Sequence, residues 1–86
     1  MNNRILIIDE SEHYTNMIVN RLTNYGYDEV FLSTNGTDGV HKFEMLKPEV
    51  VVIDSRLSDV DGFKLCQQIK KMTNISTKVI LTVKLK

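Results

Sequence analysis

Cysteine is nearly absent from this chain. Cys66 is the only one among 86 residues, so no internal disulfide can form, and its position on the apolar side of a predicted helix indicates a buried thiol rather than a reactive one. No apolar stretch approaches the roughly 20 residues that span a bilayer, and the first residues lack the pattern of a signal peptide. These absences predict a cytoplasmic protein that has no membrane partner.

Net charge is also absent, because eleven basic and eleven acidic residues cancel. Nucleic acids and anionic membranes attract proteins through a concentrated positive field, and the sequence contains no basic run that would supply one. We therefore expect no nucleic-acid partner. The length and the 42% hydrophobic content suit one globular domain over residues 1–86, with no room for a second.

The most informative stretch is the apolar run at residues 50–53, which ends on Asp54. Unbroken β-branched residues are typical of a parallel strand that is buried on both faces. The turn signal Asp61-Gly62 follows, and the next apolar residues have helical spacing: Phe63, Leu65, Cys66, Ile69 and Met72. Asp54 therefore lies at the carboxyl end of a strand, where open α/β sheets place their chemistry.

A second strand ends in the same way. Residues 5–8 are apolar and β-prone, and Asp9-Glu10 follows them directly. If the two strands are neighbours in the sheet, Asp9, Glu10 and Asp54 converge on one pocket. Three crowded carboxylates repel one another, so such a pocket favours a hard divalent cation with oxygen ligands.

The first predicted helix begins near Ser11, a residue suited to capping, and ends at Gly26. Its apolar stripe has helical spacing and consists of Tyr14, Met17, Ile18, Leu22 and Tyr25. A short strand is then predicted at residues 30–32. The polar turn at residues 34–36 can cap the next helix.

A second helix and a last strand complete the pattern. That next helix presents Val40, Phe43 and Leu46 at three-residue steps, and Pro48 prevents its continuation. Gly39 inside it costs roughly 1 kcal/mol relative to alanine. A last strand is predicted at residues 78–82, and its alternating pattern allows it to continue to residue 86.

The predicted order is β-α-β-α-β-α-β with short connections. Right-handed crossovers between such units give a parallel sheet with helices on its faces. The sequence thus predicts an α/β domain whose acidic residues lie at one edge of the sheet.

These motifs resemble the receiver domain of two-component response regulators. Residues 5–10 resemble the first strand and acid pair of that family, and residues 47–54 resemble the strand that ends in its phosphoacceptor aspartate. Asp61-Gly62 resembles the start of the third helix, and residues 80–82 resemble the fourth strand with its switch threonine. The resemblance runs over the whole chain, and the order of the motifs makes it specific.

The resemblance implies a flavodoxin-like, doubly wound sheet, here with four strands in the order 2-1-3-4 and three helices. It implies that Asp54 accepts a phosphoryl group from a sensor histidine kinase or a small phosphodonor. It also implies a Mg²⁺ cofactor held by Asp9, Glu10, Asp54 and the backbone carbonyl of Arg56, while Thr82 contacts the phosphoryl group. The protein would then be a signalling receiver that acts through a downstream effector, and not an enzyme.

The chain departs from the family pattern at several places. Asp9-Glu10 stands where two aspartates are commoner, and Ser58 stands where proline is usual. The last helix, strand and helix of a complete receiver are missing from the sequence, together with a lysine that pairs with the phosphoryl group. We therefore expect a receiver-like domain that is incomplete at its C-terminus and leaves one flank of the first helix exposed. Lys84 is a candidate replacement for the lysine, although a solvated lysine at a strand edge is the simpler interpretation.

Two functions from different classes remain open. The first is Mg²⁺-dependent phosphoryl acceptance on Asp54, and the alternative is a degenerate receiver that serves as a phosphorylation-independent interaction or oligomerisation module. Flavin binding is disfavoured because no Ser/Thr-rich loop follows residue 8. An unpaired apolar edge at residues 78–86 predicts a homodimer or larger oligomer. His13, His41 and the side chain of Arg56 are expected to face solvent.

Overall fold

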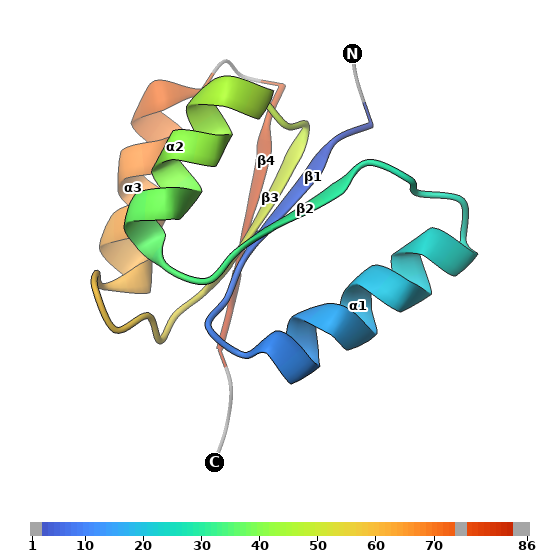
Figure 1. Cartoon of the computed structure of the whole chain (residues 1–86). Helices are drawn as coiled ribbons and strands as arrows, with labels where there is room; N and C mark the ends of the chain where they lie inside the picture. The colour runs from blue at the N-terminus through green and yellow to red at the C-terminus, as the bar shows by residue number, and fades with distance from the viewer. Residues whose placement is uncertain (1–2, 74–75, 84–86) are drawn as a thin grey trace.

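Strands and helices alternate along the chain in the predicted order (Figure 1). The computed structural model describes residues 3–73 and 76–83. Its elements are β1 (Ile5–Ile8), α1 (Glu12–Asn24), β2 (Val30–Ser33), α2 (Gly36–Leu46), β3 (Val50–Asp54), α3 (Gly62–Met72) and β4 (Lys78–Thr82). Each element lies where the sequence pattern predicts it, because apolar periodicity sets both the type and the position of an element.

The four strands form one parallel sheet in the order β2-β1-β3-β4. β1 and β3 are central, and Ile5 is paired with Val30 on one side and with Val50 on the other. The pairing of β3 with β4 ends at Asp54 and Thr82. The flavodoxin-like order that the resemblance implies is therefore confirmed, and all four carboxyl ends meet at one edge of the sheet.

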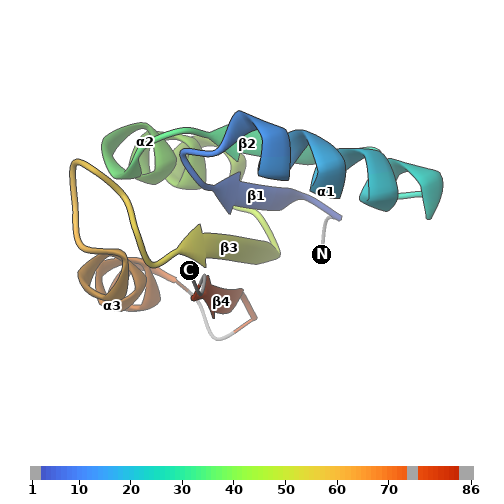
Figure 2. The same ribbon diagram turned by 90° about the horizontal axis from the view of Figure 1, so that it is seen from below.

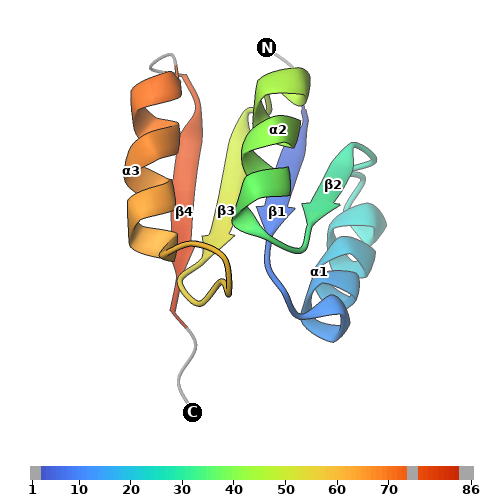
Figure 3. The same cartoon turned by 60° about the vertical axis from the view of Figure 1, so that its left-hand side comes forward.

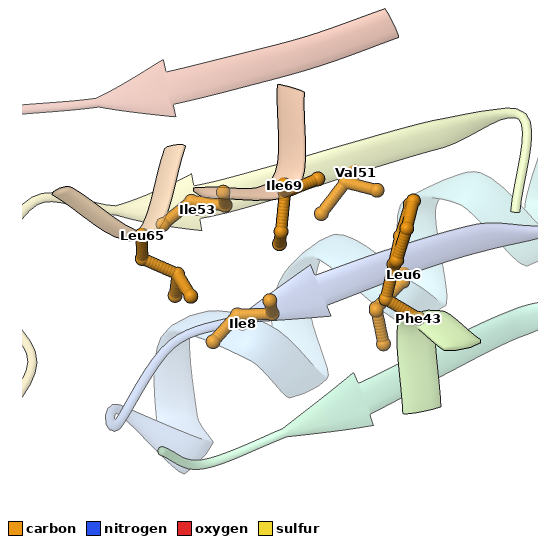
Figure 4. Packing of buried hydrophobic residues seen from close by; sticks show 7 residues of the cluster. All are labelled: Leu6, Ile8, Phe43, Val51, Ile53, Leu65 and Ile69. Atoms are coloured by element: carbon orange, nitrogen blue, oxygen red, sulfur yellow. The ribbon is translucent and has the colours of Figure 1, made fainter. Parts of the chain in front are cut away.

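Helices cover the two faces of the sheet unequally. α2 and α3 lie side by side on one face, and α1 lies on the other (Figure 2 and Figure 3). The buried apolar side chains between the sheet and the α2–α3 layer are Leu6, Ile8, Phe43, Val51, Ile53, Leu65 and Ile69 (Figure 4). Burial of one such side chain contributes about 1.5–3 kcal/mol, so this layer is the main hydrophobic core.

On its own face, α1 covers only the half of the sheet made by β1 and β2 (Figure 2). Thr15 is the one buried residue of α1, while Met17 and Tyr25 of its predicted apolar stripe are 43% and 81% exposed. Within the described residues no second helix covers β3 and β4 on this side, and Ile80 of β4 is 47% exposed. The expected exposed flank of α1 is present, and it extends onto the neighbouring half of the sheet.

The helices begin at residues that the sequence singles out, and two of them end before a residue of positive φ. Ser11, Asn35 and Asp61 are the N-caps, and their side-chain oxygens accept backbone N–H bonds of 2.8–3.2 Å; such caps contribute about 1 kcal/mol each. α1 ends before Gly26, which has a φ of +98°, and α2 ends before Lys47, which has a φ of +46°. Among the described residues, none of these helices combines the length and apolar character that a membrane crossing requires.

Gly39 has a packing role that the helix propensity does not reveal. A Cβ at this position would lie 2.5 Å from Cδ1 and 2.9 Å from Cγ1 of Ile8. Only glycine lets α2 approach β1 this closely, so the packing of α2 against the central strand offsets the propensity cost.

β4 is shorter than the alternating sequence pattern allows. The strand ends at Thr82, and Val83 lies outside it and is 63% exposed. Continuation as one strand through this residue is therefore wrong, since β3, the partner strand, ends at Asp54 opposite Thr82. Residues 84–86, and with them Lys84, lie outside the described residues.

Candidate functional site

Two buried carboxylates lie at the carboxyl edge of the central strands. Ile8 and Ile53 are paired across β1 and β3, so Asp9 and Asp54, which follow them, occupy adjacent positions. Asp9 is 2% and Asp54 is 4% exposed. Two neighbouring buried charges of one sign repel strongly, and this edge is therefore suited to a positively charged ligand.

Asp9 also organises the start of α1. Its Oδ1 atom accepts a hydrogen bond from the backbone N–H of Ser11 at 2.9 Å. Its own backbone N–H donates to the carbonyl oxygen of Ser33 at 2.9 Å. These two bonds fix the backbone of Asp9 between β2 and α1, so its carboxylate is held at the edge of the sheet.

Glu10 does not join the two aspartates. Its exposed side chain reaches the loop after β3, where a carboxylate oxygen accepts a hydrogen bond from the backbone N–H of Ser58. Hydrogen bonds from the Ser58 hydroxyl and then from this N–H lower the pKa of Glu10 below its usual value. In the described residues, no group of three His, Cys, Asp or Glu side chains lies together as a metal site. The predicted convergence of Asp9, Glu10 and Asp54 is therefore wrong for Glu10, whose carboxylate is hydrogen-bonded to Ser58 instead.

Thr82 lies beside Asp54 at the end of β4. The two residues are register partners, and the N–H of Ser55 donates to the Thr82 carbonyl oxygen at 2.9 Å. The Thr82 hydroxyl donates to the carbonyl oxygen of Ile53 at 3.4 Å. This hydroxyl is a donor at the sheet edge, next to the Asp54 position.

The loop at residues 55–61, which joins β3 to α3, is closed on itself. Arg56 and Asp61 form an isolated antiparallel bridge, and Asp61 then caps α3 by accepting from the N–H of Phe63 at 2.8 Å. Arg56 is exposed, as expected, and so are His13 and His41. The sheet edge is therefore followed by a short, internally braced loop.

Asp59 is a second anchor of this loop, and the sequence analysis did not identify it. Its carboxylate accepts backbone N–H bonds from Gly36 and Thr37, both at 2.9 Å, and a bond from the Thr37 hydroxyl at 3.0 Å. Hydrogen bonds from Gly36 and then Thr37 lower the pKa of Asp59. The loop after β3 is thereby tied to the first turn of α2.

The possible metal ligands at this edge are of the type that a hard divalent cation prefers. Asp9, Glu10, Asp54 and the Arg56 carbonyl offer only oxygen atoms, which Mg²⁺ prefers. Asp9 and Asp54 already occupy adjacent positions, and Glu10 is exposed enough to turn from Ser58 toward them. These residues therefore fit a Mg²⁺ ion once the hydrogen bond between Glu10 and Ser58 is broken.

Comparisons with known proteins agree with this topology. The family model of the response regulator receiver domain matches residues 5–85. The chain is 31% identical over 84 residues to the alkaline phosphatase synthesis transcriptional regulatory protein PhoP of Bacillus subtilis, covering 98% of this chain and 35% of that protein. It is 31% identical over 72 residues to the chemotaxis protein CheY of Thermotoga maritima, covering 84% of this chain and 60% of that protein. The chain thus spans about a third to three fifths of the length of these two relatives.

Solved structures show the same fold. A CheY-like response regulator receiver domain from Methanospirillum hungatei superposes with a TM-score of 0.89 at 24% identity, covering all of this chain and 67% of that one. The signal receiver domain of a DNA binding response regulator from Colwellia psychrerythraea gives a TM-score of 0.85 at 27% identity, covering 99% of this chain and 71% of that one. With the family model matched from β1 to beyond β4, the chain belongs to the response regulator receiver domain family.

Proposed function

We propose that this chain is a phosphoryl-accepting receiver of a two-component system and that Asp54 is its phosphoacceptor. The observation that carries the proposal is the position of Asp54: it ends the central strand β3, lies adjacent to Asp9, and is paired with Thr82. One carboxylate nucleophile, a neighbouring acid and a hydroxyl donor at a single sheet edge suit phosphoryl transfer.

Each residue has a distinct part in the proposed reaction. An Asp54 oxygen attacks phosphorus, the bond from phosphorus to the donor's leaving group breaks, and an acyl phosphate forms on Asp54. Asp9, Glu10, Asp54 and the Arg56 carbonyl would hold Mg²⁺, which supplies positive charge that neutralises the phosphoryl oxygens. The Thr82 hydroxyl then exchanges the Ile53 carbonyl for a phosphoryl oxygen, which is a stronger, charged acceptor.

The proposed partners follow from this chemistry. The phosphoryl group comes from a sensor histidine kinase or a small phosphodonor, in a cytoplasmic setting, and the phosphorylated chain acts on an effector protein. The chain is then a carrier of the phosphoryl group and not an enzyme that releases a product. The matched relatives include a transcriptional regulator and a chemotaxis protein, so the identity of the effector does not follow from the receiver itself.

The test is intact-mass spectrometry after incubation with acetyl phosphate and Mg²⁺. We expect a phosphate-sized mass increase on the parent protein and none on Asp54→Asn, because the amide is not a nucleophile. Asp28→Asn, in an exposed position before β2, is the matched control and should be labelled like the parent. Equal labelling of Asp54→Asn, or no label on a folded parent, would contradict the assignment.

A second candidate function is supported by a specific observation. Glu10 is engaged by Ser58, and the β4 edge carries the half-exposed Ile80, which suits an interaction or oligomerisation module that no longer needs phosphorylation. We propose that β4 mediates self-association in either case. A folded protein that neither accepts phosphate nor binds Mg²⁺ with beryllofluoride would favour this second function.

A further inference from the structure

The bond between Glu10 and Ser58 joins the two loops that border the sheet edge. Glu10 belongs to the connection between β1 and α1, and Ser58 to the connection between β3 and α3. The two residues are 48 positions apart in the chain, so their contact exists only in the folded protein. It closes one loop over the other beside Asp9 and Asp54.

The Ser58 end of this bond is held independently of Glu10. The next residue, Asp59, is fixed to the first turn of α2 by hydrogen bonds to two backbone N–H groups and one hydroxyl. The Arg56–Asp61 bridge closes the loop on its other side. The Ser58 N–H therefore keeps its place when Glu10 leaves, and the exposed Glu10 side chain is the part that moves.

The carboxylate oxygen that accepts from Ser58 is occupied by this bond, and Glu10 does not form a metal-binding group with two other acids in the described residues. Hydrogen bonds to a charged acceptor are among the stronger ones in proteins, and a cation must replace this bond before Glu10 can serve as its ligand. Serine contributes a backbone N–H at this position, and proline is the one residue type that would not.

We propose that the backbone N–H of Ser58 competes with the divalent cation for the Glu10 carboxylate, so that cation binding releases the contact between the two loops. This inference rests on the proposed Mg²⁺ site. Ser58 then has a positioning role. Its N–H weakens cation binding at the site, and the contact between the two loops depends on whether the cation is bound.

Calorimetric titration with Mg²⁺ alone measures the competition. Ser58→Pro removes both the N–H and the hydroxyl that bond to Glu10 and is expected to bind Mg²⁺ at least tenfold more tightly, since a hydrogen bond to a charged group contributes about 1.5–3 kcal/mol. Ser58→Ala loses the hydroxyl but keeps the N–H, so its gain is expected to be smaller than that of Ser58→Pro, and the difference between the two variants measures the part due to the N–H. Equal affinity in all three proteins would overturn the inference and leave phosphorylation of Asp54 untouched.

A measurement on the unaltered protein covers the case in which Ser58→Pro does not fold. In amide NMR spectra, Mg²⁺ is expected to shift the Ser58 resonance and to speed its hydrogen exchange several-fold, while the Gly36 and Thr37 amides, held by Asp59, keep their protection. A Ser58 amide that is unchanged at saturating Mg²⁺ overturns the inference alone. Failure of every protein to bind Mg²⁺ overturns the inference together with the proposed cation site.

Discussion

Gly62, the first residue of α3, lies against the backbone that carries the candidate phosphoacceptor. A Cβ on Gly62 would be 2.4 Å from the carbonyl oxygen of Asp54 and 2.6 Å from the Cα atom of Ser55. Neither atom belongs to a side chain that can rotate away. The missing side chain of one residue thus allows α3 to start directly beside the end of β3.

We expect Gly62→Ala to destabilise the protein by about 1–3 kcal/mol, the usual cost of overpacking a tight contact. In an ordinary helix the same change stabilises by up to about 1 kcal/mol, so the sign of the effect is diagnostic. Urea unfolding measures it, with Lys64→Ala at an exposed position of α3 as a control expected within about 0.5 kcal/mol of the parent. A more stable Gly62→Ala would show that the loop yields easily.

Individual residues were predicted well where the backbone fixes them and less well where a side chain chooses its partner. Asp54 and Thr82 end strands, so their place at the sheet edge follows from the apolar runs before them. Glu10 is exposed and flexible, and its partner Ser58 comes from a loop whose path the sequence pattern does not determine. The sequence therefore identified Glu10 as a candidate metal ligand, but only the structure shows its hydrogen bond to Ser58.

At the scale of elements, Asp59 connects the loop after β3 with the start of α2. Its carboxylate serves a helix that begins more than twenty residues earlier in the chain. Asn35 caps the same helix locally, by accepting from the N–H of Asp38. The local cap is a sequence signal, whereas the cap from Asp59 depends on two elements meeting in space, and no spacing rule predicts it.

The charge of Asp59 makes part of the stability depend on pH. Its folded pKa is lowered, so the unfolded chain binds the proton first as the pH falls, near the ordinary aspartate value of about 4. The stabilisation is therefore complete above that value and is lost as the pH falls through the folded pKa. Urea unfolding between pH 7 and pH 3 should show that Asp59→Asn loses less stability on acidification than the parent. At pH 7 the variant should be less stable by no more than about 1 kcal/mol, because the amide oxygen still accepts these bonds but more weakly than a carboxylate.

Asp28→Asn is the control for this experiment, because Asp28 is exposed in the segment before β2. It should retain the stability and the pH dependence of the parent. If Asp59→Asn loses as much stability between pH 7 and pH 3 as the parent does, the loss comes from other carboxylates. Asp38 is one of these, because the Ser33 hydroxyl and then Lys42 lower its pKa.

At the scale of the whole molecule, the uneven cover of the sheet bears on self-association. In the described part of the chain β4 lies at one edge of the sheet, and Ile80 points to the face that α1 leaves open, since Val79 and Leu81 pack against the core on the opposite side. Unpaired edges with exposed apolar residues favour pairing with another chain. The fold order was predictable from the sequence, but the extent of this open face was not, because it depends on how far α1 reaches.

Size-exclusion chromatography with light scattering at tens of micromolar tests the proposed self-association. We expect a dimer or larger species for the parent and a shift toward monomer for Ile80→Lys, which places a charge on the open face. Met45→Lys, at a 73% exposed position of α2, should leave the mass unchanged. A monomeric parent at these concentrations would contradict the proposal.

The parallel strand order also sets when the candidate site can form during synthesis. β1 is made first, yet it is paired on both sides with strands that come later, and its partner β3 lies in the second half of the chain. Long-range pairing of this kind is slow compared with helix formation. Asp9 therefore emerges from the ribosome well before Asp54, and the sheet edge that unites them with Thr82 is completed only when β4, the last described strand, has been added.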